Sequence, residues 1–117
     1  MAKLNLDDTI TALSTPPGEG GIAVIRLSGP DALMIADRYF RSRSGKKLKD
    51  TPPQHVLFGK IVDGDGKPKD DVLMTYFKAP HSYTGEDIIE VSCHGGMKVT
   101  RSLIEQLTQG GARPAEP

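Results

Sequence analysis

The run Ile22–Leu27 constrains the fold more than any other part of the sequence. Five of its six residues are apolar, so apolar side chains fall on both faces of an extended chain. A loop rich in proline and glycine, residues 14–21, precedes the run. Ser28-Gly29-Pro30-Asp31 follows it and is typical of a helix start. We predict an inner strand, covered on both faces, that leads directly into a helix.

This first helix is expected to begin at Pro30 and to fade near Arg41. Its predicted buried residues repeat at helical spacing: Leu33, Ala36 and Phe40, with Ala32 and Tyr39 beside them.

A second strand–helix unit lies near the end of the sequence. Residues 87–93 predict a strand, and His94-Gly95-Gly96 turns the chain into a helix. Val99, Leu103 and Leu107 lie four residues apart and predict its buried side, which Met97 and Ile104 are expected to join. Gly110-Gly111 is predicted to end the helix.

Three further strands complete the predicted fold. Residues 9–14 alternate as a short strand, and residues 54–62 and 71–78 flank a strong turn signal at residues 63–68, which predicts a hairpin. The polar, basic residues 41–53 are expected to form an exposed loop. The chain is thus predicted to be one domain, residues 1–117, of the α+β (mixed α/β) class. Its single mixed sheet should have about five strands, with helices mainly on one face.

Composition excludes several classes of protein. Fifteen basic and fifteen acidic residues give a formal net charge of zero, so overall electrostatics predict no strong attraction to nucleic acid or membrane. A single cysteine excludes an intrachain disulfide, and no apolar run is long enough to span a bilayer. We therefore expect a cytoplasmic protein. The three histidines lack metal-ligand spacing, and the sequence has no P-loop for GTP.

Arg26 and Glu90 are the candidate binding residues, because each interrupts an apolar strand. A carboxylate inside a covered sheet is costly unless it is paired, so one interpretation is a structural Arg26–Glu90 ion pair. Arg26 alone also fits a side chain that reaches solvent at the end of its stem. The functional alternative is a ligand site in which Glu90 accepts two parallel hydrogen bonds from adjacent N–H donors, as a pterin or a guanine offers. No catalytic or metal-binding residue is assigned.

Other motifs favour structural explanations. Cys93 lies within a strand with no activating base on its own face, so a structural thiol is expected. The glycines at 95 and 96 are interpreted as a close-packed turn rather than an anion site. The basic residues between Arg41 and Lys49 are interpreted as solvated surface, because no aromatic residues interleave with them for base stacking.

Four stretches together resemble the N-terminal domain of the MnmE (TrmE) family of bacterial tRNA-modification GTPases. They are Asp8–Ile10, Thr15–Gly29, Ser82–Asp87 with Glu90 and Cys93–Gly96, and Gly111–Pro117. The resemblance implies a fold similar to the tetrahydrofolate-binding domain of the glycine-cleavage T-protein. It also implies a homodimer that binds 5-formyltetrahydrofolate or 5,10-methylenetetrahydrofolate near the dimer interface, with Arg26 and Glu90 at positions the family uses for folate.

The resemblance further implies a role in modifying the wobble uridine of tRNA, together with the flavoprotein MnmG (GidA) and away from the membrane. GTP, Mg²⁺ and K⁺ would belong to the family's GTPase domain, which lies outside these residues, as does a further folate-contacting lysine. Two alternatives remain: a purely structural module for dimerisation and partner docking, and a stand-alone one-carbon folate enzyme.

Overall fold

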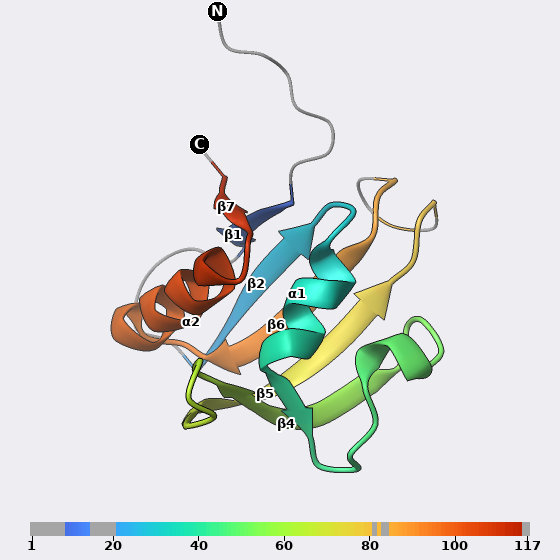
Figure 1. Cartoon of the computed structure of the whole chain (residues 1–117). Coiled ribbons are helices and arrows are strands. Elements are labelled where there is room, and N and C mark those ends of the chain that lie inside the picture. Colours follow the sequence, from blue (N-terminus) through green and yellow to red (C-terminus); the bar gives the residue numbers. More distant parts are fainter. Residues whose placement is uncertain (1–8, 15–20, 81, 83–84, 116–117) are drawn as a thin grey trace, which may run out of the picture.

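Seven strands form one mixed sheet, and both α-helices pack on the same side of it (Figure 1). A computed structural model describes residues 9–14, 21–80, 82 and 85–115. In chain order the elements are β1 (Ile10–Leu13), β2 (Ile22–Ser28), α1 (Ala32–Tyr39), β3 (Phe40–Ser42), the 3-10 helix η1 (Leu48–Asp50), β4 (Val56–Val62), β5 (Pro68–Phe77), β6 (Ile88–His94), α2 (Met97–Gln109) and β7 (Arg113–Pro114). The mixed α/β class and the placement of the helices are confirmed.

The sheet has the strand order β3-β4-β5-β6-β2-β1-β7. All neighbours are antiparallel except β1 and β7, which are parallel. The predicted hairpin is confirmed as β4 and β5. The count of about five strands is wrong, because β3 and β7 were missed. Strand β3 pairs with β4. Strand β7 pairs with β1, where Arg113 and Ala115 donate their backbone N–H groups to the carbonyls of Thr9 and Thr11.

Helix α1 starts two residues later than predicted. Asp31 is its N-cap residue, and the Asp31 N–H donates to the Thr9 hydroxyl at 2.9 Å. Residues 29–32 form a turn closed by an Ala32 N–H to Gly29 carbonyl bond, so Pro30 precedes the helix. The buried residues of α1 are Ala32, Ile35, Ala36 and Tyr39. The predicted stripe was therefore partly wrong: Leu33 is only half-buried, and Phe40 is buried as part of β3.

Helix α2 ends at Gly110-Gly111 as predicted, where Gly111 has a φ of +121° that favours glycine. Leu103 and Leu107 are buried, but the prediction for Met97 was wrong, since it is exposed at the first helical turn. Thr100 and Gln106 take buried places instead. No helix of the described residues is long and apolar enough to cross a membrane.

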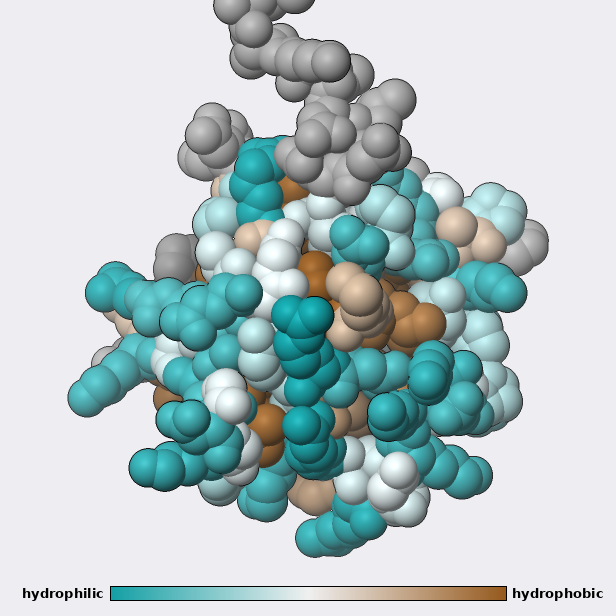
Figure 2. Space-filling model, in the orientation of Figure 1, coloured by the Kyte–Doolittle hydropathy of each residue, from teal (hydrophilic) through white to brown (hydrophobic). Residues whose placement is uncertain are grey.

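The core lies between the helices and one face of the sheet. Ile25 and Leu27 of β2, Ile89 and Val91 of β6, and Leu103 of α2 are almost fully buried there. Figure 2 shows the helix-bearing side, where hydrophilic side chains cover most of the surface.

The opposite face of the sheet, which we call the open face, is covered by no helix or strand of the described residues. It exposes four large apolar side chains: Ile22 by 72%, Val56 by 59%, Phe58 by 43% and Leu73 by 43%. The prediction that the strand Ile22–Leu27 is covered on both faces is therefore wrong. Strand β2 is central within the sheet, but within the described residues no second layer packs against its outward positions.

Candidate functional site

Arg26 and Glu90 lie directly opposite each other on adjacent strands of the open face. The β2–β6 register pairs their Cα atoms, and the Arg26 Nε donates to Glu90 Oε2 at 2.8 Å. The two side chains are 41% and 29% exposed, so water screens the pair. An exposed ion pair of this kind contributes about 0–1 kcal/mol to stability. Its main effect is to fix the orientation of both side chains.

The position of Glu90 differs from the prediction in one respect. The carboxylate was expected inside a covered sheet, but it stands on the open face and reaches solvent. Because water still reaches the Glu90 carboxylate, the carboxylate loses little hydration, and it does not need an ion-pair partner for the fold to be stable. A carboxylate has about four acceptor positions, and the Arg26 bond uses one of them. The pair leaves capacity for further N–H donors from outside the chain.

A row of side chains crosses the sheet at this level. Ala12 of β1 pairs with Arg26, and Thr75 of β5 pairs with Glu90. Apolar Val24 and the buried Ile88 lie one step away on the same face. The arrangement places one anionic and one cationic group side by side on a sheet face that carries both apolar and polar side chains. A small ligand on such a surface is held firmly only if a second layer closes over it.

Two carboxylates just before β6, those of Glu86 and Asp87, accept hydrogen bonds that hold neighbouring segments in place. Glu86 accepts a hydrogen bond from the Ser28 hydroxyl at 3.1 Å, and Asp87 accepts one from the Ala79 N–H at 2.8 Å. Burial and the neighbouring Asp87 raise the pKa of Tyr76. The motif residues 15–20, 81, 83 and 84 lie outside the described residues.

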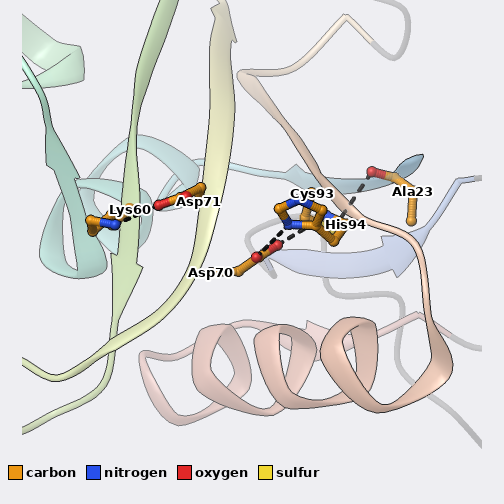
Figure 3. A network of polar contacts seen from close by, with 6 residues as sticks. All are labelled: Ala23, Lys60, Asp70, Asp71, Cys93 and His94. Atoms are coloured by element: carbon orange, nitrogen blue, oxygen red, sulfur yellow. Dashed lines mark hydrogen bonds and ion pairs between the residues drawn. The ribbon is translucent and has the colours of Figure 1, made fainter. Parts of the chain in front are cut away.

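A second polar cluster, not foreseen from the sequence, lies at the start of α2 (Figure 3). The Asp70 carboxylate accepts the backbone N–H of His94 at 2.9 Å and contacts its ring Nδ1 at 2.6 Å. Nearby, Lys60 and Asp71 form a salt bridge at 2.5 Å. The hydrogen bond and charge of Asp70 raise the pKa of His94. The contact could not be predicted from a sequence motif, because Asp70 and His94 are far apart in the sequence.

Cys93 points to the opposite side of β6 from His94. Its thiol is buried and donates to the Ala23 carbonyl at 3.6 Å. Burial, with a smaller effect of Asp70, raises the pKa of Cys93 to about 11. The thiol therefore stays protonated near neutral pH, in agreement with a structural role. The Gly95 N–H donates to the Gly21 carbonyl at 3.1 Å and is therefore not free for an anion, but the predicted close packing is wrong at Gly96, where a Cβ would meet nothing within 4 Å.

We expect Asp70→Asn to lower the pKa of His94 toward its ordinary value, because the substitution removes the charge that favours the imidazolium. A pKa raised on folding means that the pair stabilises the fold at low pH and loses this effect as pH rises through the raised value. An NMR titration of the His94 ring measures the shift.

Asp65→Asn, in the β4–β5 turn, is the control and should leave the His94 midpoint in place. Equal His94 midpoints in wild type and Asp70→Asn would show that the contact does not set the protonation of the ring.

The fold and this site define a mixed α/β domain whose candidate binding residues, Arg26 and Glu90, stand on an exposed sheet face. The family model "GTP-binding protein TrmE N-terminus" matches residues 9–117, and the chain therefore belongs to this family.

Curated relatives of the family agree with this assignment. The chain is similar to tRNA modification GTPase MnmE of Alkaliphilus metalliredigens, with 46% identity over 112 residues that cover 95% of this chain and 24% of the relative. For MnmE of Geobacillus kaustophilus the identity is 47% over 111 residues, with 94% and 24% covered. For MnmE of Moorella thermoacetica it is 47% over 113 residues, with 96% and 24% covered. The chain thus spans about a quarter of the length of these relatives.

Proposed function

We propose that this chain is the folate-binding and dimerisation module of a tRNA-modifying GTPase. The observation that carries the proposal is the cross-strand pair of Arg26 and Glu90 on the open face. Its ligand is 5-formyltetrahydrofolate or 5,10-methylenetetrahydrofolate. The folate supplies a one-carbon unit for the wobble uridine of tRNA, in cooperation with the flavoprotein MnmG in the cytoplasm.

The chemistry of the two side chains fits a folate. Glu90 accepts hydrogen bonds from the 2-amino and N3–H edge of the pterin, a pair of parallel donors that matches a carboxylate. Arg26 donates to a carbonyl or carboxylate oxygen of the folate, for which a planar guanidinium with five N–H groups is well suited. Their mutual bond at 2.8 Å holds both groups at fixed positions before the ligand arrives.

The open face supports the dimer. Ile22, Val56, Phe58 and Leu73 expose large apolar surfaces on it, with Phe58 and Leu73 directly opposite each other, and exposed apolar surface of this kind marks an interaction site. We propose that a second copy of the chain covers this face. The same contact would supply the second layer that a folate beside Arg26 and Glu90 needs, so binding and dimerisation use one surface.

Calorimetric titration with 5-formyltetrahydrofolate tests the binding role. Glu90→Ala should weaken binding by more than about 1.5 kcal/mol, because the pterin donors lose a charged acceptor. Glu105→Ala, which removes an exposed carboxylate of α2, is the matched control and should bind as wild type does. Equal affinities of wild type and Glu90→Ala would reject the proposed role of Glu90.

A purely structural module is the second candidate, and the observed ion pair favours it as well. If Arg26 and Glu90 serve only each other, the chain dimerises but does not bind folate. Light scattering combined with the folate titration separates the two functions: a dimer without folate binding supports the structural module.

A further inference from the structure

The positive charge of the chain is concentrated in one segment, residues 38–49, which we call the basic segment. It holds six of the fifteen basic residues and no acidic residue, which leaves nine basic and fifteen acidic residues for the rest of the chain. The zero net charge therefore hides a strong asymmetry. This segment, which Asp37 and Asp50 flank, is where a polyanion would meet the most closely spaced positive charges.

The fold holds the basic segment in a fixed shape. The Asp37 carboxylate of α1 accepts the N–H groups of Leu48 at 2.7 Å and Lys49 at 3.1 Å. Leu48 itself is buried in the core, and the Ser42 hydroxyl donates to the Lys46 carbonyl at 2.6 Å. The lysines thus stand on an anchored loop, and binding there costs less backbone ordering than on a flexible tail.

Among the described residues, no cation of the segment forms a salt bridge with a carboxylate, although Asp37 lies beside Arg38 and Lys47. The salt bridges among the described residues are made by Arg26, Lys60 and His94, all outside the segment. Arg41 instead donates to the backbone carbonyls of Arg38 and Phe40 at the end of α1, both at 3.0 Å. Arg43 lies over the Phe58 ring, 4.8 Å from its centre. The lysines of the segment are therefore available to an external anion.

Two surface hollows border the segment beside α1. One of about 450 Å³ lies against Arg41 and Lys46, and one of about 530 Å³ lies against Met34 and Lys49. Arg38 and Lys47 line both hollows. The lysines therefore flank concave surface on the helix-bearing side of the sheet, where a dimer through the open face would leave them accessible.

We propose that the basic segment binds the phosphate backbone of RNA, through Lys46, Lys47 and Lys49. This inference rests on the proposed role in tRNA modification, and the substrate tRNA is its ligand. The aromatic residues of the segment, Tyr39 and Phe40, are buried and cannot stack on bases, but phosphate contacts need none, because they depend on charge and position rather than on the bases. A lipid surface fits less well, since the large apolar residues of the segment, Tyr39, Phe40 and Leu48, are all buried and none is available to insert.

Fluorescence anisotropy with a labelled anticodon stem–loop RNA tests the proposal in the 117-residue chain. Affinity should fall steeply with KCl concentration, as expected for phosphate contacts. The variant Lys46→Gln/Lys47→Gln/Lys49→Gln should bind at least about tenfold more weakly, and its logarithmic salt slope should be smaller by about two, since each lost contact removes roughly 0.7–0.9.

Lys67→Gln/Lys69→Gln/Lys98→Gln makes the same change in net charge away from the segment and should retain wild-type affinity. An equal loss in both variants, or no RNA binding by wild type, would overturn the proposal. Equally tight binding to phosphatidylserine vesicles through the same three lysines would also overturn it, in favour of a membrane contact. Glu90→Ala should bind RNA normally, so a failure of the folate proposal is seen separately.

Discussion

The variant Leu73→Glu is expected to be a monomer under conditions in which the wild-type chain is a dimer. Leu73 lies near the middle of the open face, between Phe58 of β4 and Ser92 of β6 in the sheet register. In the proposed dimer a glutamate there would be buried without a partner, which costs about 3–5 kcal/mol. The dissociation constant of the dimer should therefore rise at least about 100-fold, as measured by analytical ultracentrifugation.

Met34→Glu provides the control for this experiment. Met34 is also a large exposed apolar residue, but it lies on α1, on the other side of the sheet. This variant should remain dimeric. If Met34→Glu dissociates the dimer and Leu73→Glu does not, the two copies meet through the helix side. A monomeric Leu73→Glu should also bind 5-formyltetrahydrofolate more weakly, because the second layer over Arg26 and Glu90 is lost.

Gly59→Ala is expected to destabilise the fold by about 3 kcal/mol, the upper range for overpacking a tight site. Gly59 of β4 pairs with Ser42 of β3. A Cβ at Gly59 would lie 2.7 Å from the Ser42 Cα and 2.8 Å from the Phe40 ring, and would overlap the Arg41 carbonyl oxygen. Two of these neighbours are backbone, which cannot rotate away. Urea unfolding followed by circular dichroism measures the loss.

Gly64→Ala is the matched control for Gly59→Ala, because a Cβ at Gly64 meets nothing within 4 Å. Its unfolding midpoint should stay close to that of wild type. Equal midpoints for the two variants would mean that β3 moves aside at little cost, and that the contact between β3 and β4 is loose.

Local patterns were enough to predict the longer elements. The hairpin of β4 and β5 follows from the turn residues between two apolar strands, and the end of α2 follows from two glycines. Strands β3 and β7 have three and two residues, so they show no periodicity of their own. They exist because a neighbouring strand offers them backbone partners, which is a property of the tertiary fold.

The two residues of the candidate site could be selected from the sequence, but their position in the fold could not. Arg26 and Glu90 stand out because they interrupt apolar runs, yet the register that sets them opposite each other depends on the strand pairing of the whole sheet. Apolar residues such as Ile22 on the outward face of β2 also indicated a second covering layer. The pattern records which residues avoid water, but not whether this chain or another molecule covers them.

Asp37 and Asp70 escaped prediction for a related reason. Each carboxylate accepts a backbone N–H from a distant residue, Leu48 in one case and His94 in the other. Such contacts leave no spacing signal, since they depend on where loops return to the sheet.

The brevity of β3 and β7 also bears on how such a molecule avoids uncontrolled aggregation. A sheet with an apolar face is vulnerable where its outermost strands can recruit strands from other molecules. Here those outermost strands offer only three and two residues of backbone, which is too little to template a growing fibril. In the proposed face-to-face dimer the contact is complete once two copies have joined, and the short edge strands disfavour further growth of the sheet at both edges.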